Sequence, residues 1–425
     1  MARDDGDRRG PGPDRGQLTI PSARLSAKIP LWALFGASGV SLIGNQLTSV
    51  VLPWLVLTSL GTTFDAGLVG AGVVLPGVIG AVAGGVITDR LGSRETSVIA
   101  DLASAVAIGA IPIVAFTIGL SVPLLATLAF AGALLDAPGA TARQVLLPDL
   151  ADRAGMTRER ANGLFQSIDN ASLLIGPLLA GVAIVALGPV NALWIDAGSF
   201  LFAAVLVATL VPRIRARASG EEVADVLAGL RALARDRVLR GLTVAAMVAN
   251  AVGTPAFVVL LPALAIRAGY GAGALGVVLA AFGGGLVVGS LSAERLGARL
   301  GRRRLLALAF AGTGVALALV ATAPPLPIMV ALLLLAGVAS GPVNPIAFTV
   351  MQERVPAVIR GRVFGAVIGG VLIAAPVGLL GFGALAESNG PEIGLAAGGA
   401  AFAAIGLCLA LWRSFQALDE APAAL

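Results

Sequence analysis

Residues 85–94 read GVITDRLGSR, and residues 290–299 read SLSAERLGAR. The last six positions of the two stretches are identical at four places, and the other two pair Asp with Glu and Ser with Ala. Each stretch follows a long apolar run, so we interpret them as the same loop in two related halves of one chain. Repeated halves are typical of membrane transporters in which one half rocks against the other.

The composition around this repeat indicates that lipid is the solvent of most of the chain. Of the 425 residues, 57% are hydrophobic and 12% are charged, with a mean hydropathy of +0.93. A soluble protein keeps about a quarter of its residues charged. So much apolar sequence cannot be buried away from water in a soluble fold, and the sequence predicts an integral membrane protein.

Apolar runs of about 20 residues, the length that crosses the hydrocarbon core, lie on both sides of the repeat. They fall near residues 31–57, 66–88, 97–118, 121–142, 163–187, 190–212, 242–266, 273–294, 303–322, 326–350, 361–386 and 391–412. The predicted fold class is therefore all-α, with twelve transmembrane helices in two six-helix, pseudo-symmetric halves.

The polar segments define the expected domains. Residues 1–30, rich in Arg, Asp, Gly and Pro, are expected to form a disordered cytoplasmic tail. The N-terminal half covers residues 31–212, the C-terminal half covers 242–412, and a second cytoplasmic tail covers 413–425. Between the halves, residues 213–241 are expected to form a cytoplasmic linker with an amphipathic helix on the membrane surface, with binding of a partner as the alternative.

The distribution of basic residues fixes the expected orientation. With both termini in the cytoplasm, every one of the 29 Arg and Lys residues except Arg267 lies on the cytoplasmic side, as the positive-inside rule requires. The net charge of +5 has this explanation, and we expect no nucleic-acid partner. Abundant Ala, Gly and Arg with Lys28 as the only lysine suggest a gene rich in G and C, and hence a bacterial cytoplasmic membrane.

Residue types that metals and redox cofactors need are scarce. The chain has no His and a single cysteine, Cys408, in an apolar run, so we expect no metal site, no cofactor and no disulfide within the chain. A membrane-embedded transferase would need clustered carboxylates for a metal-bound diphosphate. The close pair Asp149 and Asp152 lies in a predicted loop, and we do not expect an enzyme.

The loop after the second apolar run resembles the signature of the major facilitator superfamily. The matching residues are Gly85, Asp89, Arg90, Gly92 and Arg94. The resemblance covers the chain after residue 30 and implies the fold of that superfamily. It also implies that this loop latches the two halves together on the cytoplasmic side.

The partners expected for that latch come from the second half. They are Glu294 and Arg295 in the repeated loop, and Arg362 at the start of the eleventh span, where a helix N-terminus favours a carboxylate. The alternative is that all of these are ordinary cytoplasmic loop charges.

A second element narrows the resemblance. Span 5 contains Gly176, Pro177 and Gly181, similar to a Gly-Pro element of superfamily exporters, with Ala180 in place of a glycine. This element, with residues 147–150, 352–356 and 360–365, resembles the macrolide-efflux and enterobactin-exporter branch. The resemblance implies a monomeric antiporter that exchanges drugs for protons.

Four carboxylates within the predicted spans are candidates for proton coupling. Acids in mid-membrane are costly and normally have a function or a partner. Asp101 and Asp136 lie toward cytoplasmic ends and could instead pair with Arg94 or Arg143, and Asp196 lies one turn inside the opposite surface. Asp169 lies deeper, and a carboxylate removed from water can alternate between protonated and charged forms. Asp169 is the first candidate and Asp196 the second.

Amide side chains in mid-span are candidates for a substrate cavity. They are Asn45, Gln46, Asn170, Asn250 and Asn344, from spans that line the central cavity in the superfamily. Helix-to-helix hydrogen bonding is the alternative role. Two positions depart from the exporter pattern, because Asn45 and Gln46 stand where many relatives have an acid, and Arg143 falls at the cytoplasmic end of span 4 rather than at its middle.

An apolar cavity with few amides suits a bulky amphiphile better than a sugar. The sequence therefore predicts a secondary active transporter for multidrug efflux: proton-coupled export of an amphiphilic drug, natural product or siderophore. Uptake of a nutrient on the same fold is the alternative.

Overall fold

The computed structural model describes residues 21–213, 231, 233–355 and 360–418, and for some of these, among them 80–86, 89 and 360–362, the backbone only. The described residues form helices and short connections, without a strand. Most of the expected linker helix, residues 214–230, lies outside the described part of the chain, as do most of the residues of the two tails.

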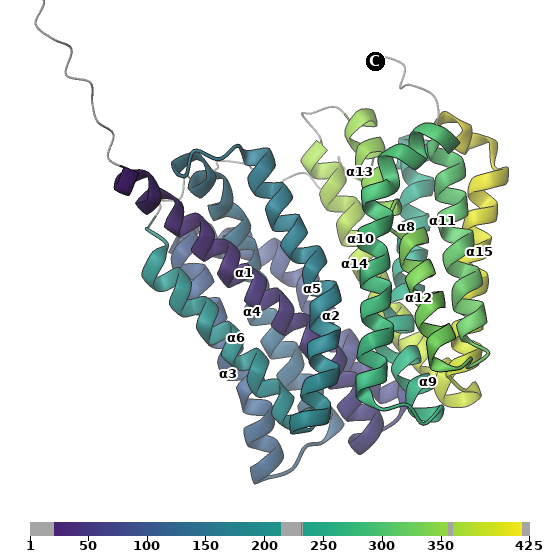
Figure 1. Ribbon diagram of the computed structural model, residues 1–425, viewed down its shortest axis with the longest axis horizontal. Coiled ribbons are helices and arrows are strands. Elements are labelled where there is room, and N and C mark those ends of the chain that lie inside the picture. Colours follow the sequence, from purple (N-terminus) through teal and green to yellow (C-terminus); the bar gives the residue numbers. More distant parts are fainter. Residues whose placement is uncertain (1–20, 214–230, 232, 356–359, 419–425) are drawn as a thin grey trace, which may run out of the picture.

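The N half is a bundle of six helices that each cross its full height (Figure 1). Its elements are α1 (Pro21–Leu55) with the π-helical turn η1 (Val56–Leu60), α2 (Thr63–Leu91), α3 (Ser93–Thr117), α4 (Val122–Arg153), α5 (Arg158–Leu187) and α6 (Pro189–Leu210). Nothing but Gly92 separates α2 from α3, and nothing but Gly188 separates α5 from α6.

The C half repeats this arrangement with two of its crossings broken into pieces. Its elements are α8 (Arg237–Pro255) continued by η2 (Ala256–Leu260) and α9 (Leu261–Arg267), α10 (Ala272–Leu300), α11 (Arg302–Val320), α12 (Leu326–Ser340) followed by α13 (Val343–Arg354), α14 (Arg360–Asn389), α15 (Pro391–Leu411) and η3 (Arg413–Leu418). Pairing the halves in order makes α8 the counterpart of α1, α10 of α2, and α15 of α6.

Eleven helical segments of the described chain are long and apolar enough to cross a membrane. The twelfth helix of the two six-helix halves is α2. It is 29 residues long, but its apolar stretch among the described residues, Thr63–Gly77, is shorter than that of the other eleven. The predicted fold class, an all-α membrane protein with two pseudo-symmetric halves, is confirmed.

Several helices are longer than the sequence predicts. α1 begins at Pro21, before the expected start at residue 31, and α10 continues to Leu300. α4 continues to Arg153 instead of ending at residue 142. The extensions carry charged residues, which an apolar-run criterion excludes although they are compatible with a helix.

The structural register of the internal repeat differs from the register of the best sequence match. Gly92, at φ +91°, joins α2 to α3, and its counterpart is Gly301, at φ +81°, which joins α10 to α11. Glycine adopts this left-handed region without strain. The counterpart of DRLGSR is therefore ARLGRR at residues 298–303, four residues beyond ERLGAR.

Two arginines confirm this register. Arg94 donates to the carbonyl oxygen of Ala208 at the end of α6, and Arg303 donates to the carbonyls of Leu409, at 2.9 Å, and Ala410 at the end of α15. The interpretation of Glu294 and Arg295 as loop residues equivalent to Asp89 and Arg90 is therefore wrong. They lie inside α10, with exposed side chains.

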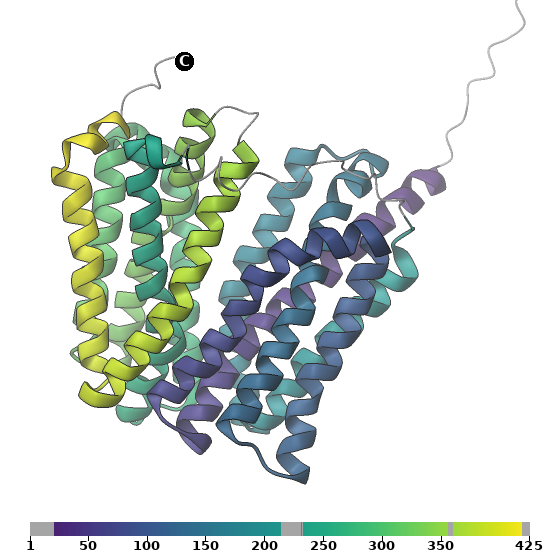
Figure 2. The same ribbon diagram turned by 180° about the vertical axis from the view of Figure 1, so that it is seen from behind.

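The two halves lean together at one end and diverge toward the other (Figures 1 and 2). We call the end where α1 begins and α15 ends the terminal end, and the opposite end the far end. At the far end Gly67 of α2 lies against Leu379 and Gly383 of α14, so closely that a Cβ at Gly67 would clash with the carbonyl oxygen of Leu379.

A second pair of helices closes the other side of the same junction. A Cβ at Gly181 of α5 would lie 2.9 Å from the carbonyl oxygen of Ala272, and one at Gly276 of α10 would lie 2.6 Å from that of Pro177. Small residues permit this approach of helix backbones in lipid. Thr62 also donates to Glu387 across the junction at 2.8 Å.

Candidate functional site

One face of α1 carries three polar side chains into the N half. Ser41, Asn45 and Thr48 follow one another at spacings of four and three residues, so they share one side of the helix. Ser41 and Thr48 are buried and Asn45 is half-buried. Each contacts a charged side chain of α4 or α6.

Arg143 of α4 is the centre of this polar cluster. Its Nη1 lies 2.6 Å from Oδ1 of Asp101 on α3, and its Nη2 lies 3.6 Å from Oδ1 of Asp136, one and a half to two turns earlier on α4. Nη2 also donates to Ser41 at 3.4 Å. The side chains of Arg143 and Asp101 are 4% and 0% exposed. Two acids face one guanidinium, so the three groups carry a net negative charge when all are ionised.

Asp136 is the member of the cluster whose carboxylate can still accept a further hydrogen bond. Asn45 donates to its Oδ2 at 2.9 Å. Its buried Oδ1 has no hydrogen bond in the described structure, only the ion-pair contact of 3.6 Å with Nη2 of Arg143. A buried acceptor left unpaired costs free energy, so this oxygen can gain from a proton or a cationic group.

Asp196 of α6 forms a separate site on the same face of α1. It is fully buried and accepts hydrogen bonds from Thr48 at 2.5 Å and Ser199 at 3.1 Å. Both carboxylate oxygens are thereby occupied, in contrast to those of Asp136.

A cavity of about 450 Å³ lies beside Asp136 within the N half. Its polar lining comes from Asn45, Thr48, Asp136, Thr141 and Gln144. Its apolar lining includes Leu52, Val73, Ile108 and Phe200. The cavity therefore offers one acid and two amides among apolar walls.

The sequence did not predict that Arg143 is buried within the N half. It lies ten residues before the end of α4, inside the helix, because α4 continues to Arg153. The expectation that it falls at the end of the helix was wrong, because ten more residues of α4 follow it. The signal was present, since residues 143–153 contain one Pro and no Gly and could extend the helix.

Asp169, the first candidate for proton coupling, lies outside this cluster. It is partly exposed on α5 and accepts a hydrogen bond from Gln166 at 3.2 Å. Asp169, Leu173, Pro177 and Gly181 follow one another at four-residue spacing, and the last three contact α10. Asp169 therefore lies on the face of α5 that looks toward the other half, one turn beyond the last contact.

The remaining amide candidates are dispersed. Asn250 donates to the carbonyl oxygen of Val371 at 2.7 Å, and Gln166 donates to Asn170 at 3.3 Å. Asn344 is exposed on α13. A Cβ at Gly176 would overlap Gln46, so Gln46 marks the close packing of α1 against α5. Of the amides named from sequence, Asn45 lines the N-half cavity.

The candidate latch is described in part. The side chains of Asp89 and Arg362 and the surroundings of Gly85 lie outside the described structure. Arg90 is exposed, and Arg94 contacts Glu95 at 3.3 Å besides the end of α6. Arg94 therefore ties α3 to α6 within the N half.

The Gly-Pro element of span 5 lies where the halves meet. Gly176 faces α1, whereas Pro177 and Gly181 face α10. The element brings three helix backbones together near the far end, which is a packing role that its small residues explain.

Comparison with known proteins agrees with this architecture. The model of the Major Facilitator Superfamily matches residues 34–292 and 257–423. The chain is 32% identical over 372 residues to the multidrug efflux pump Tap of Mycolicibacterium fortuitum, covering 85% of this chain and 90% of that protein. It is also 32% identical over 410 residues to Tap of Mycobacterium tuberculosis, covering 94% and 97%.

A solved structure with little sequence similarity has the same fold. The crystal structure of the nucleoside transporter NupG superposes with a TM-score of 0.72 at 15% identity, covering 94% of this chain and 99% of that chain.

Proposed function

This chain belongs to the Major Facilitator Superfamily, and we propose that it exports amphiphilic cations from the cytoplasm in exchange for protons. Two relatives that align over most of their length are named multidrug efflux pumps. The observation that carries the proposal is the Asp136 carboxylate, which lines a cavity with mainly apolar walls and whose Oδ1 has no hydrogen bond, only an ion-pair contact with Arg143 at 3.6 Å.

The cavity fits a drug-sized amphiphile. Its volume of about 450 Å³ falls within the range of about 300–1,000 Å³ usual for small-molecule pockets. Ile108 and Phe200 offer apolar contact, and Asp136 and Asn45 offer one negative and one amide group. A cation with an aromatic or aliphatic body satisfies both kinds of contact, whereas a sugar would leave most of its hydroxyls unpaired.

Coupling follows from competition for Asp136. A substrate cation and a proton each neutralise this carboxylate, so only one of them is held at a time. When Asp136 is protonated, Arg143 still pairs with Asp101 at 2.6 Å, and the buried arginine stays neutralised. Entry of a proton from one side and of substrate from the other then gives exchange.

The direction of transport rests on the shape of the molecule and on its charges. The helix contacts described above close the far end, and the basic residues concentrate at the terminal end, which the positive-inside rule assigns to the cytoplasm. In this conformation substrate would enter from the cytoplasm.

Export requires the terminal end to close, and the register of α2 on α14 indicates how. Gly383 lies against Thr63 and Phe64, whereas Leu379, one turn earlier on α14, lies against Gly67 and Gly70, so the two helices run antiparallel. Continuing this antiparallel order brings the end of α2, which carries Asp89, toward the start of α14. A Cβ at Gly365 would meet open space in the present conformation. Asp89 would then accept hydrogen bonds from the N-terminus of α14, as a latch.

Transport of ethidium, an amphiphilic cation, tests the proposal. In efflux-deficient bacteria the wild-type protein should lower ethidium accumulation, and a protonophore should abolish this effect. Asp136→Asn should behave like cells without the protein. Asp152→Asn, on the same helix but exposed and paired with Arg158, is the matched control and should retain export.

Everted membrane vesicles test directly whether ethidium transport is coupled to proton movement. Ethidium added to energised vesicles should release protons with the wild-type protein and not with Asp136→Asn. If Asp169→Asn abolishes this release and Asp136→Asn does not, the coupling group is Asp169 instead. A rise of ethidium accumulation on expression in cells would indicate uptake and contradict the export proposal.

A further inference from the structure

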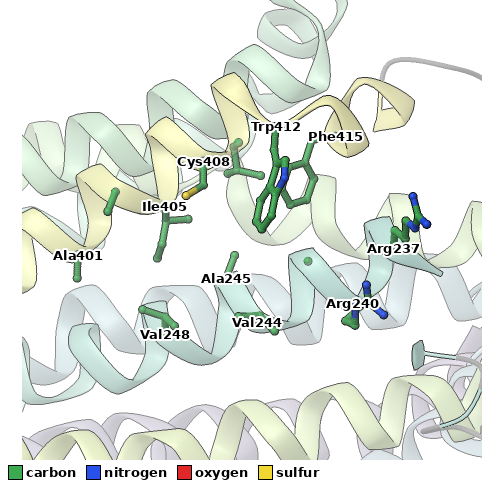
Figure 3. A pocket seen from close by; sticks show the side chains of 13 residues that line it. Arg237, Arg240, Val244, Ala245, Val248, Ala401, Ile405, Cys408, Trp412 and Phe415 are labelled. Atoms are coloured by element: carbon green, nitrogen blue, oxygen red, sulfur yellow. The ribbon is translucent and has the colours of Figure 1, made fainter. Parts of the chain in front are cut away.

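A groove of about 720 Å³ runs between α8 and α15 at the terminal end of the C half. Figure 3 shows Val244, Ala245 and Val248 of α8 facing Ala401, Ile405 and Cys408 of α15 across it. Trp412, Phe415, Arg237 and Arg240 gather at one end. The groove lies apart from the cavity beside Asp136, which belongs to the N half.

The two walls of the groove pack less closely than their counterparts in the N half, although those counterparts also border an apolar pocket, of about 410 Å³. The counterparts of its two walls, α1 and α6, pack directly in the N half, where Leu34 and Phe35 share a buried cluster with Ala203 and Val207. A Cβ at Gly44 would clash with Asp196, which shows how closely these helices approach.

In the C half α8 contacts α15 toward the far end of the groove and contacts η3 at the terminal end. Gly253 lies against Phe402 toward the far end, and Gly241 lies against the ring of Phe415 at the terminal end. Between these points small side chains, such as Ala401 and Ala404, leave the space open.

The walls of the groove suit a hydrocarbon chain. Val244 is 53% exposed and Trp412 is 64% exposed. On a helix that crosses a membrane such exposed apolar side chains face lipid. A tryptophan beside the end of a span is typical of the membrane–water interface.

The mouth of the groove suits an anion. Arg237 and Arg240 lie one turn apart at the start of α8, where the helix dipole adds positive potential. Nη1 of Arg240 donates to the carbonyl oxygen of Ala234 at 2.9 Å. Within the described residues no carboxylate forms an ion pair with either arginine. The adjacent Asp236 is engaged by the backbone N–H groups of Val238 and Leu239 and by Arg354 at 3.5 Å.

We propose that this groove binds one anionic phospholipid from the leaflet at the terminal end. The phosphate lies between Arg237 and Arg240, and an acyl chain follows Ala245, Val248 and Ile405. Basic pockets between transmembrane helices on the cytoplasmic side recognise anionic headgroups in this way.

Cys408 provides a reporter for the test. It is the only cysteine of the chain, it is exposed, and it lines the groove. The rate of its alkylation by a maleimide is measured on the full-length protein in detergent, with palmitoyl-oleoyl phosphatidylglycerol added stepwise. Phosphatidylcholine with the same chains and glycerol 3-phosphate are the comparison ligands.

Phosphatidylglycerol should slow the alkylation, whereas phosphatidylcholine should do so only at higher concentration and glycerol 3-phosphate not at all. Each of Arg237→Gln and Arg240→Gln should weaken the protection about fivefold, the change expected for one basic residue near an anionic lipid. The variant Arg231→Gln/Arg235→Gln removes two exposed arginines of the same region that do not line the groove, and it should keep full protection.

Three results would overturn the proposal. Equal protection by phosphatidylcholine would mean that the groove selects no charge. Protection by glycerol 3-phosphate would mean that it binds free phosphates without a lipid chain. Unchanged protection in both arginine variants would place the anion elsewhere. The transport activity enters none of these measurements, so the result is independent of the proposed export.

Discussion

At the scale of single residues, Arg143 has the largest expected effect on stability. It is buried between Asp101 and Asp136, and its removal would leave the wholly buried carboxylate of Asp101 without a counter-charge. We expect Arg143→Met to lower the free energy of unfolding by about 3–5 kcal/mol. Thermal unfolding in detergent measures this, with the exposed Arg153→Met as the control.

A second variant distinguishes charge from packing at this site. Arg143→Met combined with Asp101→Asn removes both charges, so it should recover a large part of the lost stability. A double variant as unstable as Arg143→Met alone would mean that the pair acts through shape and not through charge.

The hydrogen bond from Thr48 to Asp196 is a separate residue-scale interaction. Thr48→Val keeps the shape of the side chain but removes the donor to a buried carboxylate. The expected cost is about 1–3 kcal/mol in the free energy of unfolding. Thr209→Val, which removes a hydroxyl bonded only within its own exposed helical turn, is the control. Equal melting temperatures for the two variants would show that the Thr48 bond contributes little.

At the scale of elements, the contact of α2 with α14 controls the closed far end. Gly67→Leu places a side chain against the carbonyl oxygen of Leu379 and should force these helices apart there. If the halves rock as rigid bodies, the terminal end then closes. Spin labels at Arg153 and Arg299, in a Cys408→Ser background, should show a shorter distance in this variant.

The control for this experiment is Gly163→Leu on α5. A Cβ at Gly163 meets open space, so this variant should leave the label-to-label distance at the wild-type value. If Gly67→Leu also leaves the distance unchanged, closing of the terminal end is not linked to opening of the far end.

At the scale of the whole molecule, the two ends are expected to lie on opposite sides of the membrane. Basic residues gather at the terminal end, so that end should be cytoplasmic. In a Cys408→Ser background, Ala323→Cys at the far end should react with a membrane-impermeant maleimide in intact cells. Arg299→Cys at the terminal end should react only after permeabilisation. The reverse pattern would invert the proposed orientation and the proposed direction of transport.

The amino-acid sequence was sufficient to establish that this protein lies in a membrane, how many helices cross it, and that the helices form two related halves. A run of about 20 apolar residues is long enough to cross the membrane, so the helices can be counted from the sequence. The repeated stretch shows where each half lies, and neither inference needs the tertiary structure. The Gly-Pro element and the acids in mid-span were also visible as unusual residues, because Asp136 and Asp196 are costly in lipid wherever they lie.

The tertiary structure decided which of these residues act together. Arg143 lies 42 residues from Asp101 and 102 from Ser41 along the chain, and no periodicity within one helix brings them together. Gly301 and Arg303 show which residues of the C half correspond to DRLGSR. The stretch most similar in sequence, ERLGAR, lies about one helical turn before the structural counterpart, ARLGRR. The groove between α8 and α15 is likewise a property of packing, because it depends on how closely two helices far apart in the sequence approach each other.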